Sequence, residues 1–138
     1  MHLLVAGVVE VNGDKGSGKI LFTENTLFAF RSPRIPRLAL HFGLLGALIY
    51  YAICAMRAKK PPPEHLEDPE ISALDASTQK KLAAETLLCS FPLRDGFIVT
   101  PSKLGFAFTA TGRPEVNYKG FMYKKRVIAF LQEQGIPI

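Results

Sequence analysis

The chain has 138 residues, a formal net charge of +5 at pH 7, 48% hydrophobic residues and two cysteines. A chain of this length leaves no room for a large enzyme core once its most apolar segment is set aside. The cysteines, Cys54 and Cys89, lie in segments that we expect to be far apart, so the chain lacks the disulfide framework of a small secreted domain.

The amino-terminal region predicts two β-strands. Leu3–Asn12 and Lys19–Phe30 are rich in β-branched and aromatic residues, and the glycine-dense sequence GDKGSG separates them. An isolated hairpin is only marginally stable in water, so we expect residues 1–37 to form a β-hairpin-like segment that needs another surface. The first residues have neither the features of a secretory signal nor those of a mitochondrial presequence.

The glycine-dense sequence also fits the phosphate-binding pattern G-x-x-x-x-G-K over Gly13–Lys19. A Walker A loop further requires a Ser or Thr after the lysine to hold Mg²⁺, and a helix that begins there. Ile20 follows Lys19 instead, and the residues after it are typical of a strand. A hairpin turn therefore explains these residues better, and nucleotide binding through Gly13–Lys19 is kept as an alternative.

The run from Leu38 to Met56, LALHFGLLGALIYYAICAM, predicts a single transmembrane helix. As an α-helix it would extend over roughly 28 Å, close to the ~30 Å hydrocarbon core of a bilayer. Cations lie near both ends, so the positive-inside rule gives no orientation. Five of these flanking cations are expected to contact lipid headgroups or partner subunits. They are Arg34, Arg37, Arg57, Lys59 and Lys60.

Two features within residues 38–56 bear on what this helix would contact. Ala39, Gly43 and Ala47 recur every four residues, and small residues at this spacing predict a helix-packing face. His41 lies near that face. An interfacial or hydrogen-bonded histidine is the simpler interpretation, and contact with a haem, a quinone or a lipid near His41 is left open.

A proline-rich acidic linker is expected over residues 57–69, followed by a small α+β region over residues 70–138. Asp68 and Pro69 are typical of a helix start, as N-cap and first helical residue. The sequence predicts one helix or two from there to about Ser90, then short strands and a last helix. These later elements are Phe97–Thr100, Leu104–Ala110 and Lys119–Gln134.

The stretch Lys119–Arg126 interleaves aromatic residues with the cations Lys124, Lys125 and Arg126. Such a stretch can stack bases and neutralise phosphates, or lie on anionic lipid or an acidic neighbouring protein. For a chain tethered to a bilayer, lipid or protein contact is the preferred interpretation, and nucleic acid the less favoured one.

The sequence shows no active-site constellation, since its histidines are scattered and no catalytic or metal-binding motif is present. We therefore predict an α+β membrane protein with one transmembrane helix, without cofactor, metal or small-molecule substrate. The predicted function is a non-catalytic accessory subunit of a large membrane complex, namely a respiratory-chain or ATP-synthase assembly of the mitochondrial inner membrane. The alternatives are a subunit of a thylakoid complex, and a membrane-anchored nucleotide- or nucleic-acid-binding protein that uses Gly13–Lys19 or Lys119–Arg126.

Overall fold

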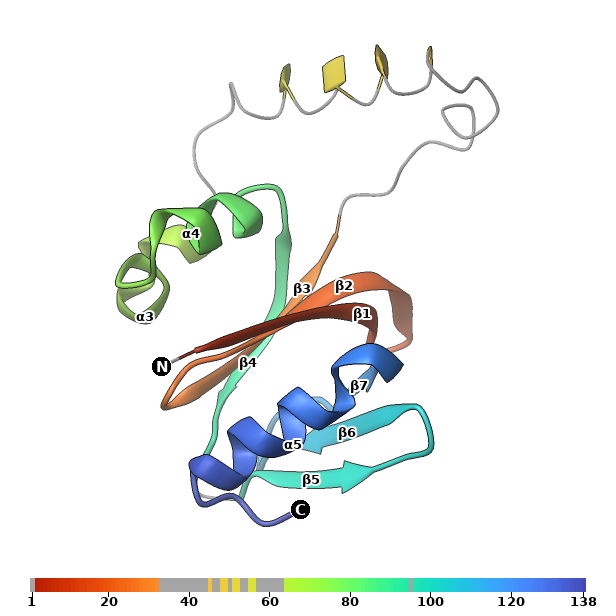
Figure 1. Cartoon of the computed structure of the whole chain (residues 1–138), viewed down its shortest axis with the longest axis vertical. Coiled ribbons are helices and arrows are strands. Elements are labelled where there is room, and N and C mark those ends of the chain that lie inside the picture. Colours follow the sequence, from red (N-terminus) through yellow and green to blue (C-terminus); the bar gives the residue numbers. More distant parts are fainter. Residues whose placement is uncertain are drawn as a thin grey trace. The chain divides into compact units, whose positions relative to one another are not determined.

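In the computed structural model, seven strands form one antiparallel sheet in the order β4-β3-β2-β1-β7-β6-β5 (Figure 1). The structure describes residues 2–32, 45, 48–49, 51–52, 55–56, 64–94 and 96–138. The strands are β1 (Leu3–Val11), β2 (Asp14–Phe22), β3 (Thr26–Arg31), β4 (Thr86–Pro92), β5 (Ile98–Pro101), β6 (Gly105–Thr109) and β7 (Val116–Lys119). The helical elements outside residues 45–56 are η1 (Glu64–Glu67), α3 (Pro69–Ser72), α4 (Ala76–Leu82), η2 (Phe121–Tyr123) and α5 (Lys124–Glu133).

The chain divides into two compact units, which are described separately. Unit 1 combines the two ends of the sequence, and unit 2 is the segment between them. Unit 1 comprises Met1–Ser32 and Leu87–Ile138, and unit 2 comprises Pro33–Thr86. The boundaries predicted at residues 37, 56 and 69, between the hairpin-like segment, the apolar run, the linker and the last region, stay predictions.

The first predicted strand, Leu3–Asn12, is confirmed as β1. The second, Lys19–Phe30, is wrong as a single strand, because its residues are divided between β2 and β3, and β2 begins already at Asp14. The turn between β1 and β2 is therefore much shorter than expected. Asn12 and Gly13 form it with positive φ values of 52° and 82°, the backbone that a two-residue hairpin turn requires. The remainder of GDKGSG belongs to β2, where Gly18 lies opposite Gly7 of β1. The glycines after Gly13 are therefore strand residues.

Strands from both ends of the sequence pair directly in unit 1. β1 and β7 are antiparallel neighbours, with Val8 opposite Lys119 and Val11 opposite Val116. β7 in turn pairs with β6, and β6 with β5. The surface that the amino-terminal hairpin needed is thus supplied by the carboxyl-terminal strands, and β7 is an element that the sequence analysis missed.

The predicted single-pass membrane protein is wrong. Among the described residues, no helix is both long enough and apolar enough to cross a bilayer. One crossing at residues 38–56 would also leave the segments before and after it on opposite sides of the bilayer, whereas β1 and β7 are hydrogen-bonded neighbours. The membrane class and the inner-membrane location inferred from that helix are corrected with it, and the role of accessory subunit stays a prediction. The prediction failed because hydropathy describes one segment and carries no information on which distant strands pair.

The sheet of unit 1 is strongly curled, because its two edge strands are consecutive in sequence. Seven strands laid flat would separate β4 from β5 by about 29 Å. The connection 93–97 between these two strands spans at most about 20 Å. Aromatic rings bridge the gap: the centroid of Phe97 lies 5.7 Å from that of Phe91 in β4 and 6.0 Å from that of Phe108 in β6.

Helix α5 covers the inner face of the curled sheet (Figure 1). Phe130 of α5 lies 5.8 Å from Phe22 of β2, measured between ring centroids, and Phe22 contacts Phe108 edge-on at 5.6 Å. Val127 and Leu131 complete the buried side of the helix. The last helix is thus confirmed, but it begins at Lys124 because Lys119 belongs to β7.

In unit 2, the predicted helix start at Asp68 is confirmed, since its side chain accepts a hydrogen bond from the Glu70 N–H at 2.9 Å. Asp75 caps α4 in the same way through the Thr78 N–H at 3.2 Å. The helix expected to continue to about Ser90 ends at Leu82, and β4 begins at Thr86. Pairing within the sheet outweighs the moderate helical propensity of these residues.

Candidate interaction surface

Tyr118 fixes the end of β7 in unit 1. Its side chain is 1% exposed, and its hydroxyl donates a hydrogen bond to the Ala6 carbonyl at 2.8 Å. Burial, and secondarily the proximity of Tyr123, raise the pKa of Tyr118 to about 12, so the hydroxyl keeps its proton at physiological pH. Because side chains alternate along a strand, a buried Tyr118 leaves the side chain of Lys119 exposed.

The tight turn between β5 and β6 lies beside this strand end. Ser102 N donates to Gly105 O at 2.9 Å and closes the turn, and Gly120 N donates to Leu104 O at 3.2 Å. These bonds hold Lys103 and Leu104 next to the residue that follows Lys119. Leu104 is 49% exposed.

Lys124 attaches the first turn of α5 to the same place. Its ammonium donates to Ser102 O at 2.7 Å and lies 5.9 Å from the centroid of Phe106. Lys125 and Arg126, which follow it, are exposed. The Arg126 guanidinium lies 5.9 Å from the ring centroid of Tyr123. Met122, just before the helix, is 84% exposed.

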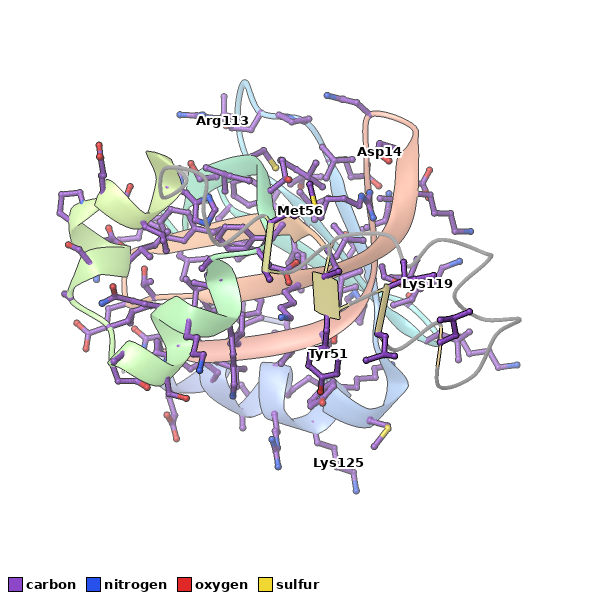
Figure 2. The ribbon with its side chains drawn as sticks, turned by 90° about the horizontal axis from the view of Figure 1, so that it is seen from above. Asp14, Tyr51, Met56, Arg113, Lys119 and Lys125 are labelled. Carbon is purple, nitrogen blue, oxygen red and sulfur yellow. The ribbon has the colours of Figure 1, made fainter. Side chains whose placement is uncertain are left out.

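Hydrogen bonds join these three elements, and we call the place where they meet, with its exposed cations, the β7–α5 corner. Its members come from the β5–β6 turn, the end of β7 and the start of α5, and Lys125 projects away from the ribbon in Figure 2. None of its four cations forms an ion pair with an acidic side chain that the structure describes. The corner consists of Lys103, Leu104, Lys119, Met122, Lys125 and Arg126.

The helix start itself adds positive potential to the corner. The first turn of α5 contains Lys124, Lys125 and Arg126 and no acidic residue, and no side chain caps its N-terminus. The N-terminus of a helix carries partial positive charge, so cations there are less favourable than anions. In the free chain, these three cations are therefore repelled by the positive end of the helix dipole and by one another. A carboxylate that approaches them would reduce this repulsion.

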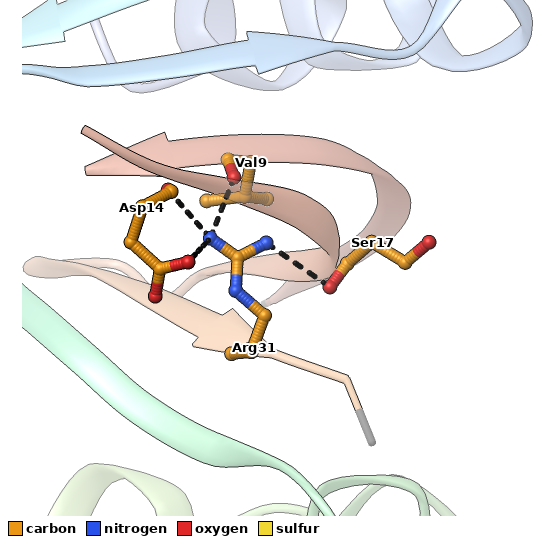
Figure 3. Close-up of polar contacts among 4 residues, drawn as sticks. All are labelled: Val9, Asp14, Ser17 and Arg31. Atoms are coloured by element: carbon orange, nitrogen blue, oxygen red, sulfur yellow. Dashed lines mark hydrogen bonds and ion pairs between the residues drawn. The ribbon is translucent and has the colours of Figure 1, made fainter. Parts of the chain in front are cut away.

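The β1–β2 hairpin, in contrast, uses its glycine-rich sequence to accommodate an arginine (Figure 3). One terminal nitrogen of Arg31 donates to the carbonyls of Val9 and Asp14, at 2.8 and 2.7 Å. The other donates to the carbonyl of Ser17 at 3.3 Å, and the Asp14 carboxylate lies 3.3 Å from the guanidinium. The guanidinium lies over Gly16, where a Cβ would come within 3.0 Å of it.

This arrangement does not form a phosphate-binding loop. Lys19 lies within β2, opposite Ala6 of β1 and Phe30 of β3. β2 is paired with β1 along its whole length, and with β3 from Gly18 onward, so its backbone is extended and does not form a loop around a phosphate. β2 continues to Phe22, so no helix N-terminus follows Lys19. We therefore set aside nucleotide binding through Gly13–Lys19.

The predicted site residues divide into those that the structure brings together and those outside its described part. Lys125 and Arg126 belong to the corner, and Lys124 supports it. Lys103, Leu104 and Met122 were missed, because only the pairing of β6 with β7 brings the β5–β6 turn to this place. Outside the described residues lie Arg34, Arg37, Ala39, His41, Gly43, Ala47, Arg57, Lys59 and Lys60.

Comparison with known proteins identifies no relative of this chain. No family model matches it, and no curated protein or solved structure does so either. Any assignment of function therefore rests on the geometry of the chain itself.

Proposed function

We propose that this protein is a non-catalytic interaction subunit of a multi-protein assembly, and that it contacts its partner through the β7–α5 corner. The observation that carries the proposal is that three hydrogen-bonded neighbouring elements bear four exposed cations and two exposed apolar side chains. Stable interfaces combine apolar contact with a charged rim that steers association. The corner offers both on a rigid support.

The support is rigid because the fold itself holds the corner. Tyr118, Lys124 and the β5–β6 turn are engaged in hydrogen bonds to the backbone of neighbouring elements. A surface held in this way loses little conformational entropy when a partner docks, which favours binding.

Site-specific photocross-linking in the native cells tests the proposal. A photoreactive residue at position 122, in the corner, is compared with one at position 15, at the exposed start of β2. We expect a discrete covalent adduct larger than the 15.2 kDa chain from position 122 alone. Equal labelling from both positions, or no adduct from position 122, would contradict an interface at the corner.

A further inference from the structure

Resting on the proposed function, we infer that the β7–α5 corner recognises an acidic protein segment that carries bulky apolar side chains among its carboxylates. Charge complementarity is the first argument. Lys103, Lys119, Lys125 and Arg126 are exposed and have no described acidic partner. Clustered cations of this kind attract a chain of carboxylates over roughly a Debye length, about 8 Å at physiological salt.

The apolar members of the corner distinguish a protein segment from a nucleic acid. Leu104 and Met122 are exposed between the cations, where they can contact aliphatic or aromatic side chains. Binding of single-stranded nucleic acid relies instead on exposed aromatic faces. Tyr118 is buried, and Tyr123 packs against the core. The Tyr118 ring is therefore closed to a base, and the Arg126 guanidinium lies over the Tyr123 ring.

The free edge of β5 bears on how the segment binds. Ser102 pairs with Gly105, so alternation places the N–H groups of Thr100 and Ile98 towards β6. Positions 99 and 101 of β5 then face away from β6, and Pro101 has no N–H group. Val99 is therefore the one residue of β5 with an N–H group on this edge. A partner strand would find few hydrogen bonds at this edge. Recognition therefore depends on side chains and not on extension of the sheet.

The start of α5 supplies an energetic reason for carboxylates. Its first turn holds three cations and no acid, at the end of the helix where positive charge is unfavourable. Carboxylates docked beside Lys125 and Arg126 remove this repulsion, so the bound state gains stability that the free chain lacks. Binding should therefore raise the melting temperature of the full chain.

Fluorescence anisotropy with two labelled peptides tests the inference. Both have about twelve residues and the same number of glutamates, interspersed with leucines in one peptide and with serines in the other. We expect the full chain to bind the leucine peptide about tenfold more tightly than the serine peptide. Affinity should fall between about 50 and 200 mM salt, because the cations are exposed.

Matched variants assign the binding to the corner. The double variant Lys119→Glu/Lys125→Glu should weaken binding of both peptides by about tenfold or more. Arg94→Glu/Arg113→Glu makes the same change in net charge outside the corner and should alter affinity less than about twofold. Met122→Ser should reduce binding of the leucine peptide and leave that of the serine peptide unchanged.

Three results would overturn the inference. A single-stranded oligouridylate of equal charge that binds more tightly than the leucine peptide would indicate a nucleic-acid surface. Equal affinity for the two peptides would indicate unselective attraction of polyanions. If neither peptide bound while position 122 still cross-linked in cells, the interface would stand and the acidic partner chemistry would be wrong.

Discussion

Arg31 of β3, which lies over the β1–β2 hairpin, and the cations of the β7–α5 corner are used in opposite ways. Against the hairpin, the side chain of Arg31 is 12% exposed and its terminal nitrogens donate to three backbone carbonyls of β1 and β2. In the corner, Lys119 and Lys125 are exposed and have no described acidic partner. One set of cations stabilises the fold, and the other is available to a partner.

The difference shows that residue composition does not reveal what a cation does. The hairpin has the sequence pattern of a phosphate-binding loop, yet its glycines make room for an arginine and for close strand approach. The corner has no comparable sequence motif for ligand binding, yet its cations are exposed to solvent. What separates them is whether backbone carbonyls of the same chain already accept their hydrogen bonds. Four predictions test this distinction, from the largest expected effect to the smallest.

Gly18→Ala should be the most damaging change. A Cβ at Gly18 would collide with the backbone carbonyl oxygen of Phe30 and come within 2.9 Å of the Val9 side chain. Because backbone cannot move aside cheaply, we expect a loss of about 3 kcal/mol in the free energy of unfolding, measured in urea. Gly16→Ala is the matched control and should cost less, since a Cβ there would meet a side-chain nitrogen of Arg31 at 3.0 Å and no backbone atom. Equal losses for both would refute the steric argument.

Arg31→Met should cost about 2 kcal/mol, because it leaves three backbone carbonyls without their charged donor. Arg126→Met removes the same chemical group from the corner, and its effect should stay within about 0.5 kcal/mol, as is usual for surface changes. Paired urea titrations check both values. If Arg126→Met proved as costly as Arg31→Met, the two regions would not differ as described.

Tyr118→Phe should cost about 1 kcal/mol at neutral pH, through loss of the hydrogen bond to Ala6. The pKa of Tyr118 is raised to about 12 in the folded chain, from an ordinary value near 10. Between these values the folded state holds a proton that the unfolded state has released, so stability falls as pH rises from 10 to 12. In Tyr118→Phe this fall should be shallower, as urea titrations at several alkaline pH values would show. Parallel curves would contradict the assignment.

Lys125→Glu should have the smallest effect and the opposite sign. An acid in the first turn of α5 interacts favourably with the helix dipole, so the free chain should gain about 0.5 kcal/mol at low salt. The gain should disappear near 1 M salt, where the Debye length is about 3 Å. Lys125→Gln, which removes the charge without reversing it, should give an intermediate value. Destabilisation by Lys125→Glu would show that this cation already serves the fold.

Local features of the fold follow well from the sequence. The first strand, the helix start at Asp68 and the last helix all depend on patterns within a few residues, and the structure has elements in these places. The hydropathy of residues 38–56 alone predicts a transmembrane helix. That prediction is wrong, and the pairing of β1 with β7, from the two sides of this run, contradicts it. The corner was found in part: Lys125 and Arg126 were predicted, and Lys103 was not.

The sequence by itself determined which residues alternate in a strand, which side chains can cap a helix and where a glycine must form a turn. These properties depend on backbone sterics and on neighbours a few positions away. Only the tertiary structure decided that β1 pairs with β7, more than a hundred residues later, and that Lys103 joins Lys119. Such pairing depends on how apolar faces from distant segments bury one another, and no local pattern specifies the partner.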